Sequence, residues 1–235
     1  MPLSALPHFL ARHEAQGAFV GEPIAQFEIG SMRNLVYLVI DWATRRCAWV
    51  DPQSDLSEPL GAIETHGLEL ERILLTHSHH DHIAGLPELA RRWQDVPIHC
   101  GREDLHRLPA QLRSSPRVHG LSEGDRLTVG RLELRCLATP GHSAGAISYL
   151  FEAGGRPWLL TGDTIFVRDC GRTDLPTGST EELFATLQRV RKLAPETVLL
   201  PGHHYAPEVA TTLGAELQSS PPFQCRTSAE LEALP

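Results

Sequence analysis

The sequence predicts an α+β protein in which two β-rich layers are covered by helices. Two observations support this fold class: short β-rich segments open each half of the chain, and helical segments follow them in each half. The 235 residues are 41% hydrophobic and 21% charged, which is ordinary globular composition. Because no clear repeat or low-complexity linker divides the chain, we expect one domain over residues 1–235, with a short helical tail from about residue 206.

In the first half, short runs rich in branched and aromatic residues predict strands. They are Ile24–Ile29, Asn34–Ile40, Arg46–Val50, Arg72–Leu75 and Ile98–Cys100. Helices are predicted around Glu58–Thr65, over Leu86–Trp93, where apolar residues recur at helical spacing, and over Arg102–Arg107. We expect Arg113–His119 to form an irregular surface loop.

The second half repeats this style. The predicted strands are Arg126–Val129, Arg131–Ala138, Ala146–Phe151, Trp158–Thr161 and Thr197–Leu200. The run from Ser179 to Glu182 has the pattern of a capping box, so it predicts the start of a helix that Pro195 ends. A last helix is expected from Pro207 onward.

The charge of the chain limits its partners. The formal net charge is −8, which argues against a nucleic-acid partner. Lys192 is the only lysine, so an anionic group on a substrate must be met by arginine, histidine or backbone amides.

Cysteine usage and the N-terminus indicate a cytoplasmic protein. The five cysteines are widely spaced and form no CxxC motif, so neither a disulfide scaffold nor a cysteine zinc site is expected. Met1–Phe19 lacks the basic start and continuous apolar core of a signal peptide, and no run is long enough to span a membrane.

A dense cluster of metal-binding residue types follows the predicted strand Arg72–Leu75. The stretch reads Thr76-His77-Ser78-His79-His80-Asp81-His82. Imidazole and carboxylate groups are good ligands for zinc, iron or manganese. A cluster of them on a loop held by a rigid scaffold indicates a site for chemistry.

Four later segments also place polar residues directly after predicted strands. They begin at Pro140, Gly162, Gly171 and Pro201, and each has a glycine beside the candidate residue. If these strand ends meet at one edge of the fold, five histidines and two aspartates converge there. They are His77, His79, Asp81, His82, His142, Asp163 and His203. That set is large enough for two metals sharing one bridging carboxylate.

The run from His77 to His82 resembles the HxHxDH signature of the metallo-β-lactamase superfamily. His142, Asp163 and His203 resemble its three later ligand motifs, in the same order. The resemblance implies a four-layer αββα sandwich with the site at one edge of the β-layers. It also implies that one metal is held by His77, His79 and His142, a second by Asp81, His82 and His203, and that Asp163 bridges them.

Within the superfamily, the chain is similar to glyoxalase II, the hydroxyacylglutathione hydrolases. The similar segments are Asn34–Val39, Thr161–Arg172 and Gly202–Tyr205. The resemblance implies a thioesterase in which a metal-bridging hydroxide attacks a thioester carbonyl, with Asp81 orienting this nucleophile. Two zinc ions are expected, with iron or manganese as alternatives. The expected substrate is a small thioester, and glutathione is a candidate for its thiol part. Candidate substrate contacts are Arg168, Arg172 and Tyr205.

Two other activities remain open. Gly171–Asp174 is shared with the persulfide dioxygenases, which use a single iron held by the equivalents of His77, His142 and Asp163 and oxidise glutathione persulfide. Gly202 and His204 differ from the alanine and aspartate typical of that group, which favours the hydrolase. A lactone or other ester hydrolase is the second alternative. Glyoxalase II carries a longer C-terminal helical region that binds glutathione, whereas about thirty residues follow Tyr205 here, so glutathione is left open as the thiol carrier.

Some chemistry-bearing residues have simpler interpretations. Gly141–Gly145 matches the GxSxG nucleophile elbow, but an elbow requires a helix after the serine and a strand is predicted here. His80 fills a variable position of the signature. We expect Arg172 to form an ion pair with Asp174, and Cys170 to be a packed structural thiol.

Overall fold

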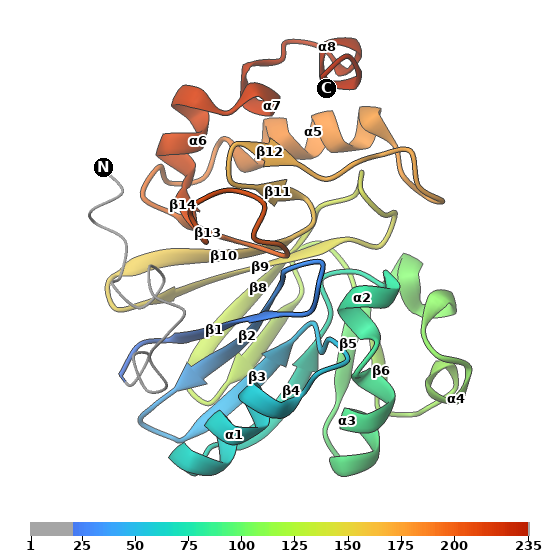
Figure 1. Cartoon of the computed structure of the whole chain (residues 1–235), viewed down its shortest axis with the longest axis vertical. Helices are drawn as coiled ribbons and strands as arrows, with labels where there is room; N and C mark the ends of the chain where they lie inside the picture. Colours follow the sequence, from blue (N-terminus) through green and yellow to red (C-terminus); the bar gives the residue numbers. More distant parts are fainter. Residues whose placement is uncertain (1–20, 235) are drawn as a thin grey trace.

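Two β-sheets face each other in the middle of the molecule, and helices cover the outer face of each (Figure 1). The structure is a computed structural model, and it describes residues 21–234. The stretch for which the sequence predicts no signal peptide, residues 1–19, lies outside the described residues. No helix among the described residues is long and apolar enough to cross a membrane.

The first sheet contains all the strands of the first half of the chain. Its order is β1 (Ile24–Ile29), β2 (Asn34–Asp41), β3 (Arg46–Val50), β4 (Glu69–Leu74), β5 (Ile98–Gly101) and β6 (Val118–Leu121). The pairs from β1 to β3 are antiparallel, and the pairs from β3 to β6 are parallel.

The second sheet is built from the second half of the chain. Its order is β14 (Thr211–Thr212), β13 (Val198–Pro201), β10 (Arg156–Gly162), β9 (Ile147–Ala153), β8 (Leu132–Ala138) and β7 (Arg126–Val129). Only β10 and β13 pair in parallel; the other neighbours are antiparallel. A separate hairpin joins β11 (Ile165–Phe166) to β12 (Asp169–Cys170).

Helices lie on both outer faces of the sheet pair. The first sheet carries α1 (Ser57–His66), α2 (His80–Ile83), α3 (Leu86–Arg92), the 3₁₀ helix η3 (Arg102–Arg107) and α4 (Ala110–Arg113). The second carries α5 (Thr180–Val190), α6 (Leu213–Ser219), α7 (Pro221–Gln224) and α8 (Ser228–Glu232).

Strand β2 shows how one sheet packs against helices on one face and against the other sheet on its opposite face. All eight of its residues are buried, because its side chains alternate between two apolar clusters. Val36, Leu38 and Ile40 face the helices of the first half. Leu35, Tyr37 and Val39 face the opposite sheet. A third cluster joins the second sheet to α5–α8, so the four-layer αββα sandwich is confirmed.

Most predicted strands and helices are present, and two expectations were wrong. The segment 113–119 is not simply a loop, because α4 ends at Arg113 and β6 begins at Val118. The last helix does not begin at Pro207: β14 intervenes, and the helical tail begins at Leu213. The helix predicted over Arg102–Arg107 is present as a 3₁₀ helix, a tighter coil than an α-helix.

A buried carboxylate ties the two sheets together at the end of β2. Asp41 accepts hydrogen bonds from the backbone N–H of Arg131 at 2.8 Å and from Nε and Nη2 of the same residue at 3.0 and 2.9 Å. Thr44 and Ala43 donate to it as well. The Arg131 guanidinium holds the pKa of Asp41 well below its usual range.

We expect Asp41→Asn to lower the free energy of unfolding by about 1–3 kcal/mol at pH 7, because an acceptor for charged and backbone donors is lost. The folded-state pKa of Asp41 lies below its unfolded value of about 3.9. The extra free energy of unfolding that the Asp41 carboxylate gives the wild type is therefore fully present above the unfolded-state pKa. It is lost as pH falls through the folded-state pKa. Urea denaturation at pH 7 and pH 2, with exposed Asp95→Asn as control, measures this; an equal loss at both pH values would contradict it.

Candidate metal centre

The structure brings the seven predicted site residues together at one edge of the sheet pair. His77 and His79 lie in the loop after β4, and Asp81 and His82 lie in the short helix α2 that follows. The other three follow strands of the second sheet: His142 after β8, Asp163 after β10 and His203 after β13. The site thus exists only where both sheets end side by side.

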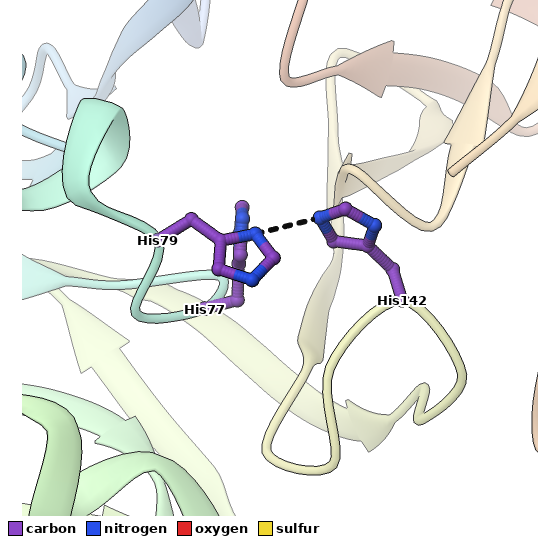
Figure 2. A group of neighbouring side chains, drawn as sticks. All are labelled: His77, His79 and His142. Atoms are coloured by element: carbon purple, nitrogen blue, oxygen red, sulfur yellow. Dashed lines mark hydrogen bonds between the residues drawn. The ribbon is translucent and has the colours of Figure 1, made fainter. Parts of the chain in front are cut away.

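One group of donor atoms comes from His77, His79 and His142. Their nearest ring nitrogens all lie within 4.8 Å of one another. Figure 2 shows the two rings of the first loop facing the ring from the opposite loop, with His79 Nδ1 2.8 Å from His142 Nε2. Three nitrogens at this spacing form one face of a tetrahedral metal site.

A second group comes from Asp81, His82 and His203, whose donor atoms also lie within 4.8 Å of one another. The His82 and His203 Nε2 atoms are 3.1 Å apart. Asp163 lies between the two groups. Its Oδ2 is 3.6 Å from His142 Nε2 and 3.3 Å from His203 Nε2, and its Oδ1 is 3.3 Å from His82 Nε2. This carboxylate is placed to serve both groups.

Asp51, directly after β3, orients His82 from behind. Its carboxylate lies 3.0 Å from His82 Nδ1 and accepts from the backbone N–H and the hydroxyl of Thr76 at 2.7 and 2.6 Å. Because these three contacts occupy the carboxylate, Asp51 fixes the ring and leaves Nε2 directed toward the centre. Asp51 was not assigned to the site from the sequence.

Backbone carbonyls orient two further rings in the same way. His142 Nδ1 lies 2.8 Å from the carbonyl oxygen of Arg172, and His203 Nδ1 lies 2.9 Å from that of Met32. When one ring nitrogen carries the proton and donates it in a hydrogen bond to a carbonyl, the other nitrogen of the neutral ring has a free lone pair that can bind a metal. In both residues this is Nε2, the nitrogen that faces the centre.

The donor set fits divalent metals. His77 Nε2 and Asp163 Oδ1 are buried and have no hydrogen-bond partner among the described residues. A buried polar atom without a partner is costly, and a metal ion between the two groups would satisfy both atoms. The oxygen and nitrogen donors suit zinc, iron or manganese. The role of the seven residues as ligands stays a prediction.

The charges of the site agree with this arrangement. Burial lowers the pKa of His77 well below its usual range and that of His79 to about 4, so both rings are neutral. Although burial opposes it, the neighbouring carboxylates raise the pKa of His82, and they raise that of His203 to about 9. Metal binding would therefore displace protons from the second group.

Two buried side chains that sequence reasoning did not assign to the site hold its loops in place. Asn34, at the start of β2, donates from Nδ2 to Asp81 Oδ2 at 2.8 Å. Asp104, in η3, is fully buried and accepts from the backbone N–H groups of Ser78 and Gly145 at 2.9 and 3.1 Å. It thereby joins the loop of His77 and His79 to the loop of His142. An acidic residue in a predicted helix is usually exposed, so the sequence carried no signal for this role.

Helix α5 supports the His142 loop from the other side. The predicted cap is present, since Ser179 Oγ accepts from the backbone N–H of Glu182. The Ser179 N–H donates to the Gly141 carbonyl at 2.8 Å. Gly141 has a φ of 139°, and a Cβ there would lie 2.4 Å from the Leu183 backbone, so only glycine fits this contact.

The three candidate substrate residues have different surroundings. Arg168 pairs with Glu208 at 2.6 Å, and Arg172 makes two contacts of 2.6 Å with Asp174, as its simpler interpretation predicted. Tyr205 is 57% exposed and stacks on the His203 ring, with centroids 4.7 Å apart. Of the three, only Tyr205 presents an unpaired exposed surface beside the centre.

The simpler interpretations also hold for other residues. His80 is exposed, and no contact joins it to the other site residues. Cys170 is largely buried, and burial raises the pKa of its thiol to about 12, so it is not a nucleophile. Ser143 is followed by strand β9, and its hydroxyl donates to Asp104, so the nucleophile elbow is absent.

The chain belongs to the metallo-β-lactamase superfamily, whose family model matches residues 34–203. It is 38% identical over 174 residues to a hydroxyacylglutathione hydrolase from Rhodospirillum rubrum, a match that covers 73% of this chain and 62% of that relative. The chain thus spans less than two thirds of the relative's length.

Two solved structures resemble this one closely. ETHE1 from Myxococcus xanthus has a TM-score of 0.77 and 30% identity, with 90% of this chain and 92% of that chain covered. TTHA1623, in a di-iron-bound form, has a TM-score of 0.69 and 30% identity, with 84% and 98% covered. These likenesses support the fold and a centre of metal-binding type.

We expect Asp104→Ala to lower the free energy of unfolding by about 2 kcal/mol or more, because two buried backbone N–H groups lose their acceptor. Urea denaturation measures this change. The exposed neighbour Glu103 makes none of these contacts, so Glu103→Ala is the matched control. Equal stability of the two variants would show that Asp104 does not hold the loops together.

Proposed function

We propose that this protein is a metal-dependent hydrolase that cleaves small acyl thioesters, as a hydroxyacylglutathione hydrolase would. The observation that carries the proposal is the Asp163 carboxylate, which lies within 3.6 Å of ring nitrogens of both donor groups. A shared carboxylate between two three-donor groups is the arrangement of a two-metal hydrolytic site. The similarity to the Rhodospirillum rubrum enzyme supports the reaction class.

In this proposal, His77, His79 and His142 would hold one metal, and Asp81, His82 and His203 would hold the second. Asp163, which lies between the two groups, would serve both. Zinc is our first expectation, and iron or manganese would fit the same donors. The di-iron form of TTHA1623 supports a site for two ions. When bound, two such metals lower the pKa of water toward neutrality and polarise a carbonyl group.

Asp81 has a second task in the proposal. Asn34 holds one of its oxygens, and that oxygen lies 3.2 Å from His203 Nε2. A carboxylate fixed in this way accepts a hydrogen bond from the attacking water and so orients it toward the substrate carbonyl. Asp81 is therefore the residue that we propose as catalytic in addition to its contact with metal.

The substrate side of the site is partly aromatic. Tyr205 stacks on His203, and Phe166 meets Tyr205 edge-on at 5.3 Å. We propose that the thiol portion of the substrate, with glutathione as the first candidate, lies against the exposed face of Tyr205. Arg168 and Arg172 contact the substrate in this proposal only if they leave Glu208 and Asp174.

We place the protein in the cytoplasm. All five cysteines are free thiols, and four of them are buried, which suits a reducing compartment. The net charge of −8 supports a small-molecule substrate over nucleic acid.

A persulfide dioxygenase is the second candidate, because Gly171–Asp174 resembles that group. The match to ETHE1, which covers 90% of this chain and 92% of that chain, is compatible with it. In this case a single iron would be held by His77, His142 and Asp163. His79, Asp81, His82 and His203 would then lack a shared role, although they converge on the same centre. The completeness of both donor groups favours the hydrolase.

We expect purified protein to contain two divalent metals per chain and to hydrolyse S-lactoylglutathione. It should consume no oxygen when glutathione persulfide is supplied instead. Asp163→Ala should lower both the metal content and the rate, the rate by on the order of 10³-fold, since the metals supply several kcal/mol of stabilisation. Metal analysis, thioester and lactone hydrolysis, and oxygen consumption are the measurements. One iron per chain with oxygen uptake and no thioesterase activity would overturn the hydrolase.

We expect Gly202→Ala to weaken the second metal site. A Cβ at this position would lie 2.1 Å from Asp163 Oδ1 and 2.9 Å from His82 Cε1, so both side chains must shift. The metal content should fall from two toward one per chain, because His77, His79 and His142 are not displaced. In the control Gly61→Ala, the new Cβ in α1 meets open space. Two tightly bound metals in both variants would show that the second group tolerates the shift.

A further inference from the structure

Most arginines near the site are already neutralised, and one is not. Arg168 and Arg172 are held by Glu208 and Asp174. Arg107, by contrast, is half-buried and makes no hydrogen bond or ion pair with any residue in 21–234. A half-buried guanidinium has lost part of its hydration, which costs free energy. Without a carboxylate partner, no ion pair or hydrogen bond within the protein offsets this cost.

Arg107 is positioned by the same short helix that braces the site loops. Asp104 in η3 accepts from the Ser78 N–H, which lies one residue before His79. In a 3₁₀ helix, side chains three residues apart eclipse, with a rise of about 6 Å between them. Arg107 follows Asp104 by three residues, so it leaves η3 on the face that meets this loop.

The Arg107 guanidinium lies close enough to the His79 ring for the two groups to interact electrostatically. Arg107 therefore lies beside the donor group of His77, His79 and His142.

We propose that Arg107 binds a carboxylate group of the substrate and so selects anionic thioesters over neutral ones. This inference rests on the proposed thioesterase function and adds a specificity-determining residue to it. The planar guanidinium matches a carboxylate with two parallel N–H···O bonds. With Lys192 as the only lysine, and with Arg168 and Arg172 paired, Arg107 is the cation available beside the centre.

The test compares Arg107→Gln with Arg91→Gln in the full-length, metal-loaded protein. Arg91 is exposed on α3 and is not one of the site residues, so its replacement by glutamine makes the same change in charge away from the centre. S-lactoylglutathione carries carboxylates, and the lactoyl thioester of N-acetylcysteamine is neutral. We expect Arg107→Gln to lower kcat/KM for the anionic thioester about 10–100-fold, mainly through KM, and to leave the neutral one unchanged.

Binding gives a second measurement that does not depend on turnover. Calorimetry with S-methylglutathione, which is not a thioester, should show affinity about 10-fold or more weaker in Arg107→Gln than in Arg91→Gln. Arg107→Lys should recover only part of the loss, because an ammonium group lacks the two-pronged geometry. The unfolding temperatures should agree within about 2 °C, since Arg107 makes no contact that stabilises the fold.

The outcomes separate the two proposals. If the wild-type protein hydrolyses neither thioester, the proposed function fails, and this inference fails with it. If the wild type hydrolyses both and Arg107→Gln behaves as Arg91→Gln does, only the role of Arg107 is overturned. An equal loss on the anionic and the neutral thioester would also overturn it, because a carboxylate contact must discriminate between them.

Discussion

The buried Asp163 carboxylate is the constraint on which the rest of the site depends. It lies between histidines that follow strands of both sheets. Its Oδ1 atom lies 3.3 Å from His82 Nε2 but has no hydrogen-bond partner among the described residues. Neither sheet could satisfy this carboxylate alone. The two sheets must therefore end at the same edge and in one relative position, which the apolar cluster between them and the Asp41–Arg131 link maintain.

Three of the five histidines of the centre are held by groups outside it. Backbone carbonyls hold His142 and His203, and a carboxylate holds His82. Because these partners lie on the ends of strands and in tight turns, the donor atoms are fixed before any ligand arrives. The parts that face a substrate, the exposed ring of Tyr205 and the unpaired Arg107, lie outside this rigid set.

Strands were the easiest elements to predict, since short apolar runs between turn residues mark them in both halves of the chain. Strand β6 was missed because its pattern is only partly buried, and the C-terminal tail was misplaced because β14 has two residues. The convergence of the seven polar residues followed from their common place after strands. Asp104 and Asp51 could not be assigned in this way, because their partners lie at least 26 and 25 residues away, respectively.

The sequence by itself determined the order of strands and helices, the apolar alternation that builds the layers, and the residue types available to a metal. These are local properties, readable from spacing along the chain. Only the tertiary structure decided which nitrogen of each ring faces the centre, that Asp163 lies between two groups, and which arginines are already paired. Those features depend on contacts between residues far apart in sequence, and packing of the two sheets alone brings them within hydrogen-bonding distance.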